Sequence, residues 1–151
     1  MPDLLVNLLK LPVVESTDAF ILRRAQPFEL SAVREFVATN FSAAWADEIS
    51  VGFAHQPISV YVATIERKLV GFSAYECTRR GFFGPTGVTQ SAQGKGIGKA
   101  LLLASLWGLR EMGYVYAIIG AAGPVRFYQK TVGAIIIPDS EPGIYTDILK
   151  R

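Results

Sequence analysis

The stretch that most constrains the fold is a short β-type run that meets a glycine-rich turn and opens directly into a long apolar helix. It reads Val88-Thr89-Gln90-Ser91-Ala92-Gln93-Gly94-Lys95-Gly96-Ile97-Gly98-Lys99. The first turn of a helix leaves about four N–H groups without internal partners, and glycine lets another group approach the backbone closely. The turn is therefore a natural cradle for a phosphate group.

Two lysines add positive charge to this turn. Lys99 falls in the first helical turn, where the helix dipole disfavours a cation by about 0.3–1 kcal/mol. An anion bound at the same place reverses the sign of that effect. The positions of Lys95 and Lys99 therefore indicate a bound anion.

Two common phosphate loops do not fit the stretch. A Walker loop fails because Gln93 stands where it requires glycine and Ala100 where it requires serine or threonine. The dinucleotide fingerprint fails because Lys99 replaces its third glycine, and Ile118 and Ile119 stand where an acid is required.

The pattern that does fit is Q/R-x-x-G-x-G/A, read here as Gln93-Gly94-Lys95-Gly96-Ile97-Gly98 after a strand that ends in valine. It resembles the acetyl-coenzyme A loop of the GNAT N-acetyltransferases. Downstream, Val125-Arg126-Phe127-Tyr128-Gln129-Lys130-Thr131-Val132-Gly133 is similar to the family's F-Y-x-K-x-G-F segment, with Ala134 in place of the last aromatic residue. The resemblance covers roughly residues 19 to 150.

Periodicity and turn residues predict an alternation of strands and helices. Strands are expected at 20–24, 59–65, 69–76, 82–89, 114–119, 134–137 and 144–149, and helices at 27–37, 42–53, 97–112 and 124–132. The apolar run 114–119 is typical of a central strand reached by a helical crossover, so it should lie parallel to 82–89. Gly84-Pro85 predicts a bulge or a locally unpaired edge.

The family resemblance implies an α/β domain with the acyl-CoA N-acyltransferase fold. Its central mixed sheet is mostly antiparallel, its fourth and fifth strands are parallel and splayed, and helices cover both faces. A chain of 151 residues predicts one domain. We expect residues 1–18 to form an N-terminal extension that packs on the domain or on a partner subunit of a homodimer.

Composition excludes several classes of protein. The apolar run 4–11 is too short for a membrane span and lacks the basic leader of a signal peptide. A formal charge of +2 gives no basic stripe for nucleic acid. One cysteine, Cys77, and one histidine, His55, exclude a disulfide framework and a zinc cluster. We expect a cytoplasmic protein without a metal.

The resemblance also assigns the donor site. The pyrophosphate of acetyl-CoA would lie on the amides from Gly94 to Lys99, with Gln93 bracing the turn, and the pantetheine arm would pair with main chain at Val88 and Thr89. The expected cofactor-binding residues are Val88, Thr89, Gln93, Gly94, Lys95, Gly96, Ile97, Gly98 and Lys99. Backbone N–H donors aimed at the thioester carbonyl are worth about 3 kcal/mol.

Tyr128 matches the family tyrosine that protonates the leaving thiolate. The chain departs from the family just upstream, where Ala121 and Pro124 replace the asparagine and alanine of N-x-x-A. One cofactor contact should therefore be lost or replaced.

The general base is not fixed by the sequence, because the run 82–89 contains no carboxylate. Glu76, near the end of the preceding strand, is the preferred candidate, and a chain of water molecules is an alternative that requires no single base. The side chains that remain as alternatives are Asp47, Glu48, His55 and Glu141. The residues expected to line the acceptor site are Phe82, Phe83, Glu141 and Tyr145, with Trp45 as a further aromatic wall.

The expected function is acetyl transfer from acetyl-CoA to the primary amine of a small molecule. Two alternatives stay open. One is a non-catalytic acyl-CoA-binding or sensing domain, because the run 82–89 lacks a carboxylate. The other is an acetyltransferase for protein N-termini or lysines, which would require an open groove.

Overall fold

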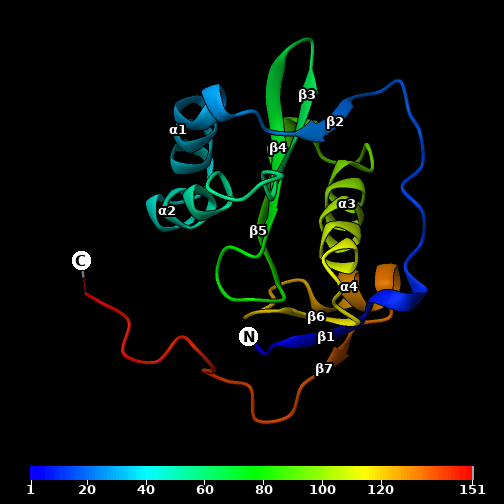
Figure 1. The fold of residues 1–151 in the computed structure, drawn as a ribbon, viewed down its shortest axis with the longest axis vertical. Coiled ribbons are helices and arrows are strands. Elements are labelled where there is room, and N and C mark those ends of the chain that lie inside the picture. Colours follow the sequence, from blue (N-terminus) through cyan, green and yellow to red (C-terminus); the bar gives the residue numbers. More distant parts are fainter. Residues whose placement is uncertain (151) are drawn as a thin grey trace.

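A computed structural model describes residues 1–150 and shows a seven-stranded sheet with helices on both faces (Figure 1). The strand order is β2-β3-β4-β5-β6-β1-β7. Strands β5 and β6 are parallel, and every other neighbouring pair is antiparallel. The mixed, mostly antiparallel sheet predicted from the sequence is therefore confirmed.

The elements follow one another along the chain with short connections. The strands are β1 (Leu4–Asn7), β2 (Ile21–Arg24), β3 (Val60–Ile65), β4 (Lys68–Tyr75), β5 (Phe82–Val88), β6 (Tyr116–Ile119) and β7 (Ile135–Ile136). The helices are α1 (Leu30–Asn40), α2 (Ala43–Gly52), α3 (Ile97–Glu111) and α4 (Val125–Val132), with 3-10 turns η1 (Leu8–Lys10), η2 (Pro27–Glu29) and η3 (Gln90–Ala92).

Local sequence explains where several elements begin and end. The β3–β4 hairpin turns at Glu66 and Arg67, whose φ angles of 52° and 65° are typical of a tight hairpin turn. Helix α2 begins after Ser42, whose side chain accepts a hydrogen bond from the Trp45 N–H. Gly113, with a φ of 105°, follows the end of α3.

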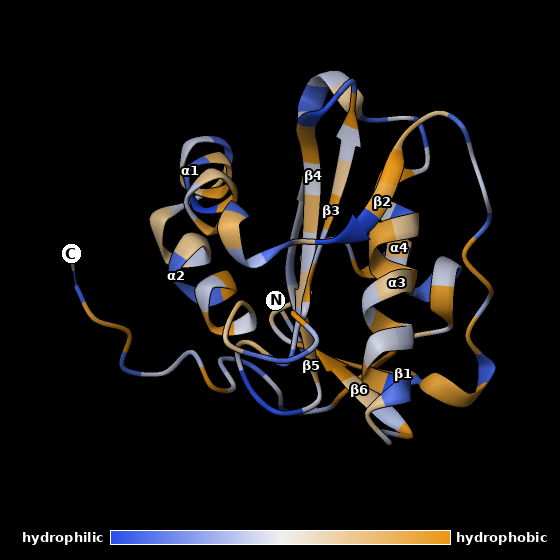
Figure 2. Ribbon diagram, turned by 45° about the horizontal axis from the view of Figure 1, so that its top comes forward, coloured by the Kyte–Doolittle hydropathy of each residue, from blue (hydrophilic) through white to orange (hydrophobic). Residues whose placement is uncertain are grey.

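The two faces of the sheet carry separate groups of helices. Helices α1 and α2 cover one face, where Val33, Val37 and Ile49 belong to the same buried cluster as residues of β3 and β4. Helix α3 covers the other face, and Leu102 and Leu106 lie in a cluster with residues of β1, β5 and β6. Figure 2 shows the same separation from a second angle, with α3 and α4 on one side of the sheet.

The N-terminal segment is part of the sheet. We expected residues 1–18 to be an extension packed on the domain or on a partner, but β1 lies between β6 and β7 and pairs with both. Leu4, Val6 and Leu8 are fully buried. Buried and half-buried residues alternate along β1, as expected of a strand inside a sheet. Its buried side packs against α3.

The expected strand at 144–149 does not form. The edge strand β7 pairs only with β1, and residues 144–149 pair with no strand among the described residues. This segment runs away from β7 toward α2 (Figure 1), and Ile148 and Leu149 are 64% and 87% exposed.

The irregularity predicted at Gly84-Pro85 is present. Ser73 lies opposite Thr86 and Tyr75 lies opposite Phe83, so two residues of β5 face the single residue between them on β4. This is a β-bulge, which bends the strand that carries the extra residue. Proline has no N–H to donate to the ladder, which explains why the bulge falls there.

The burial of β1 gives the first prediction. Leu4→Ala should lower the free energy of unfolding by about 2–5 kcal/mol, because it empties a fully enclosed site. Leu9→Ala, at a side chain that is 58% exposed, is the matched control and should change it by less than about 0.5 kcal/mol. Urea unfolding measures both, and equal small effects would show that β1 is not integral to the folded domain.

Candidate active site

The site begins where β5 and β6 separate. They pair only at Phe82 with Ile118 and at Phe83 with Ile119. The Thr89 N–H donates to the Val70 carbonyl at 2.8 Å, toward β4. Because successive N–H groups of a strand point in opposite directions, the Val88 N–H points to the open side. The predicted splay is therefore present, and it exposes extended main chain.

A cavity of about 440 Å³ lies in this opening, and we call it the splay cavity. Its walls come from β5, the first two turns of α3, the loop after β6, and α4. They include Thr86, Val88, Gly98, Leu102 and Tyr128. The strand, the glycine-rich turn and the tyrosine singled out in the sequence therefore meet around one space.

The glycine-rich turn presents unpaired backbone donors beside this cavity. Gly94 and Gly96 have φ angles of 85° and 78°, and no atom lies within 4 Å of a Cβ built at either residue. Within residues 1–150, the N–H groups from Gly94 to Lys99 have no protein acceptor. Such a run of free donors at the start of a 15-residue helix fits a diphosphate.

The other predicted loop residues are differently placed. Gln93 is exposed at the start of the turn, and its own N–H donates to the Gln90 carbonyl at 3.3 Å. The Ile97 side chain is buried, so only its backbone is available to a ligand. Thr89 has a buried hydroxyl without a hydrogen-bond partner in the described residues. Lys95 and Lys99 border a smaller cavity of about 260 Å³ beside α3.

Tyr128 lies on α4 with 5% of its surface exposed, and it lines the splay cavity. Its ring centroid is 6.3 Å from that of Phe83, in an edge-to-face arrangement. Burial raises the pKa of Tyr128 to about 12, so the hydroxyl keeps its proton at neutral pH. No protein hydrogen bond occupies this hydroxyl in the part of the chain that is described, which leaves it free to act on a ligand.

The loop between β6 and α4 departs from the family pattern, and the structure shows what supports it. Ala121 stands at the position of the family asparagine with a φ of 44°. Its N–H donates to Asp3 Oδ1 at 2.8 Å, and the Ala122 N–H donates to the Pro2 carbonyl at 2.8 Å. Sequence reasoning missed Asp3, because 118 positions separate the two partners and no motif joins them.

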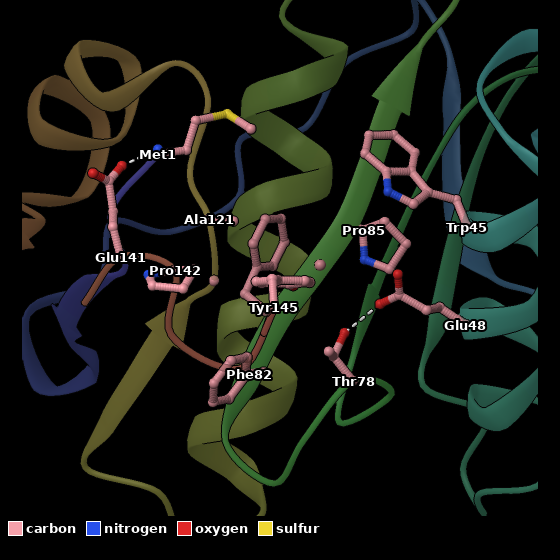
Figure 3. A pocket seen from close by; sticks show the side chains of 13 residues that line it. Met1, Trp45, Glu48, Thr78, Phe82, Pro85, Ala121, Glu141, Pro142 and Tyr145 are labelled. Carbon is pink, nitrogen blue, oxygen red and sulfur yellow. Dashed lines mark hydrogen bonds and ion pairs between the residues drawn. The ribbon is translucent and has the colours of Figure 1, made fainter. Parts of the chain in front are cut away.

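A second cavity of about 690 Å³ continues from the first, and we call it the outer cavity. Trp45, Phe83, Gly84 and Pro85 line both cavities, so the two spaces are joined. The expected acceptor-site residues Phe82, Phe83, Glu141 and Tyr145 all line the outer cavity, as does Trp45. The structure brings this predicted group together, although its members come from β5, α2 and the segment after β7 (Figure 3).

Two of the candidate bases lie in the outer cavity. Glu48, on α2, accepts a hydrogen bond from the Thr78 hydroxyl, and Glu141 forms an ion pair with the amino group of Met1 (Figure 3). Thr78 was not expected from the sequence, because nothing in its local pattern distinguishes it from any turn residue.

Glu76, the preferred base, does not line either cavity. Strand β4 ends at Tyr75, and Glu76 adopts a φ of 59° in the following turn. Its carboxylate accepts hydrogen bonds from the Gly81 N–H and from the Tyr114 hydroxyl, the latter at 2.9 and 3.0 Å. Glu76 therefore holds the turn that leads into β5.

Two further candidate bases also lie elsewhere. The His55 Nε2 donates to the Glu76 carbonyl at 3.0 Å, and His55 lines a separate cavity of about 330 Å³ together with Glu76. Asp47 lies 3.3 Å from the Arg34 guanidinium in an ion pair. Of the side chains that the sequence left open, the structure places Glu48 and Glu141 where a ligand can reach them from the splay.

The described residues contain neither a metal-binding cluster nor a membrane-spanning helix. Within residues 1–150, no group of three or more His, Cys, Asp and Glu side chains is arranged to hold a metal ion. In the same range, no helix combines the length and the apolar character needed to cross a membrane.

Comparison with known families identifies the family of the chain. A model of the acetyltransferase (GNAT) domain matches residues 56–131, which include β4, the glycine-rich turn, α3 and most of α4. The chain therefore belongs to the GNAT acetyltransferase family. No curated protein matches it.

Solved structures share the fold. A GCN5-related N-acetyltransferase from Sphaerobacter thermophilus is 19% identical, with a TM-score of 0.71 over 90% of this chain and 48% of its own. A GCN5-related glucosamine N-acetyltransferase region of a fungal multidomain GH3 β-N-acetylglucosaminidase is 17% identical, with a TM-score of 0.71 over 90% of this chain and 19% of its own.

A third structure was solved with a ligand. YhbS from Escherichia coli, a GNAT family N-acetyltransferase in complex with CoA, is 18% identical with a TM-score of 0.50 over 68% of this chain and 63% of its own. This chain thus spans less than two thirds of each of these three proteins.

The free donors of the turn give the second prediction. A Cβ at Gly98 would meet only Val88 Cγ2, at 3.8 Å, so Gly98→Asn and Gly98→Asp should both fold. Their side chains have nearly the same size, but the aspartate would repel a phosphate. Calorimetry should therefore show CoA binding at least about tenfold weaker for Gly98→Asp than for Gly98→Asn. Equal affinities would mean that no phosphate lies near this position.

Proposed function

We propose that the protein is an acetyl-CoA-dependent N-acetyltransferase that acts on the primary amine of a small molecule. The observation that carries this proposal is the joined cavity. It runs from Gly98, at the start of α3, along the open edge of β5, to Tyr128 and the outer cavity. An acyl donor and an amine can therefore approach each other from opposite ends.

Acetyl-CoA supplies an acetyl group activated as a thioester. We assign its diphosphate to the N–H groups from Gly94 to Lys99, with Lys95 and Lys99 adding positive charge. The open edge of β5 would pair with the pantetheine arm, and the Val88 N–H would donate to the thioester carbonyl. Backbone donors of this kind stabilise the negative charge that develops on the carbonyl oxygen.

The outer cavity would receive the amine in its neutral form, after the ammonium proton passes to water. The amine nitrogen forms a C–N bond to the carbonyl carbon, and the C–S bond breaks. Tyr128 protonates the leaving thiolate, and the tyrosine recovers a proton that the acylated nitrogen releases through water. The position of Tyr128 supports this role, because its side chain lines the splay cavity where the thiolate would depart.

The shape of the outer cavity supports a small acceptor. Pro142 and Tyr145, from the segment after β7, line it opposite the residues of β5 and α2. Its volume of about 690 Å³ falls in the range of small-molecule sites. An acetyltransferase for protein termini would require a groove open at both ends.

The test is CoA release, followed with a thiol reagent, over a panel of acceptors. The panel should contain amino sugars, amino acids, aliphatic amines and peptides with free N-termini. Turnover with a small amine supports the proposal, and turnover with peptides alone would indicate a protein acetyltransferase. Binding of acetyl-CoA without turnover on any acceptor would indicate an acyl-CoA-binding domain.

The position of Tyr128 gives the third prediction. Tyr128→Phe should lower kcat by about 10- to 1,000-fold and leave CoA affinity nearly unchanged, because it removes only the proton donor. Tyr116→Phe is the control, since Tyr116 is 55% exposed on β6 and lines neither cavity. Steady-state kinetics and calorimetry measure both quantities. An unchanged kcat in Tyr128→Phe would remove this tyrosine from the mechanism.

A further inference from the structure

The outer cavity has an excess of negative charge. Within residues 1–150, the charged groups at its lining residues are the carboxylates of Glu48 and Glu141 and the amino group of Met1, which is paired with Glu141. Figure 3 shows the two glutamates on opposite sides of the cavity, with Tyr145 between them. Two carboxylates against one ammonium leave the cavity with a net negative charge.

The walls between the two carboxylates are apolar. Trp45, Phe82, Pro85 and Tyr145 come from three different segments and form these walls. Such surfaces suit methylene groups, and the faces of aromatic rings also attract cations. The cavity thus combines an apolar middle with anionic sides.

In the described chain, Glu48 has one carboxylate oxygen without a donor, and Glu141 is held in an exposed ion pair. The Thr78 hydroxyl donates to Glu48 Oε2, and Oε1 has no hydrogen-bond donor in the described residues. At Glu141 an ammonium group is already seated, because the amino group of Met1 forms an ion pair with its carboxylate. The two side chains of this pair are 67% and 55% exposed, so an ammonium from solution can replace it.

The electrostatic environment of Tyr145 is also consistent with an excess of negative charge in the outer cavity. Its pKa is raised, first by burial and then by the negative charges of Glu48 and Asp3, against a smaller opposing effect of Arg79. The negative charge of Glu48 is thus felt within the apolar part of the cavity.

We propose that the acceptor is an aliphatic diamine or longer polyamine, which places one nitrogen at the acyl donor and keeps a second as an ammonium against a cavity carboxylate. This inference rests on the proposed function and names its substrate class. An amino acid would bring its own carboxylate toward two others, and an amino sugar would offer neutral hydroxyls in place of the second cation.

Three probes of one chain length separate these classes. They are 1,5-diaminopentane, pentylamine and 5-aminopentanoate, which share a primary amine and differ in a positive, neutral or negative far end. We expect kcat/KM, measured by CoA release, to fall in that order. Each step should lower kcat/KM by at least about tenfold. For the diamine, this is in addition to the statistical advantage of having two equivalent amines.

Neutral variants of the two glutamates test whether their carboxylates cause the preference for the diamine. Glu48→Gln and Glu141→Gln should each reduce the ratio of kcat/KM for 1,5-diaminopentane to that for pentylamine by at least about threefold. Glu35→Gln is the control, because Glu35 is exposed on α1 and should leave the ratio unchanged. The ratio is insensitive to a general loss of activity, so it separates recognition from damage to the fold.

The outcomes distinguish this inference from the proposed function. Equal kcat/KM values for 1,5-diaminopentane and pentylamine, or a ratio that neither glutamate variant changes, would overturn the diamine assignment and leave acetyl transfer intact. Without turnover on any probe, calorimetric titration of the three probes decides the inference alone. Tighter binding of 1,5-diaminopentane than of pentylamine supports it, and equal or absent binding overturns it.

Discussion

The site depends on main-chain hydrogen bonds that β5 and β6 do not make beyond Phe83. Two strands that begin as a parallel pair would normally continue to share hydrogen bonds, which bury their donors and acceptors. Here the bulge at Gly84-Pro85 bends β5, and β6 ends at Ile119. The remaining donors of β5 must find partners outside the sheet. The splay cavity is therefore a consequence of hydrogen-bond geometry at the bulge and at the end of β6.

Opposite charges lie at the two ends of the joined cavity. At one end, Gly98 brings the positive end of the α3 dipole, with its free N–H groups, to the cavity. At the other end stand Glu48 and Glu141. Because α3 packs on the sheet through fully or nearly fully buried leucines, the positive end is fixed relative to β5. This arrangement is consistent with the proposed binding of an anionic acyl donor at one end and a cationic acceptor at the other.

Local patterns in the sequence were enough to predict the sheet class, the hairpin, α3 and the glycine-rich turn. Each is encoded by neighbouring residues, as in the polar turn at Glu66 and Arg67 or the glycines before α3. The splay was expected from the family resemblance, and Gly84-Pro85 indicated where β5 becomes irregular. The catalytic role of Tyr128 stays a prediction.

The parts that could not be predicted depend on pairing between distant residues. Leu4-Leu5-Val6 is apolar at every position, which conceals the alternation of β1, and its partners on β6 lie more than a hundred positions away. Residues 144–149 have the composition of a strand, but they pair with no strand among the described residues. Glu76 was the preferred base because of its position near the end of β4, and only the fold shows that its carboxylate is held by Tyr114.

The place of β1 has a consequence for how such a protein can diversify. Because β1 completes the sheet, the residues that follow β7 contribute a wall of the outer cavity without contributing a strand to the core. Changes in that segment can therefore alter the wall of the outer cavity while the sheet and the glycine-rich turn stay intact. This separation favours evolvability, and it makes the segment around Glu141 and Tyr145 a natural unit for exchange in engineered chimeras.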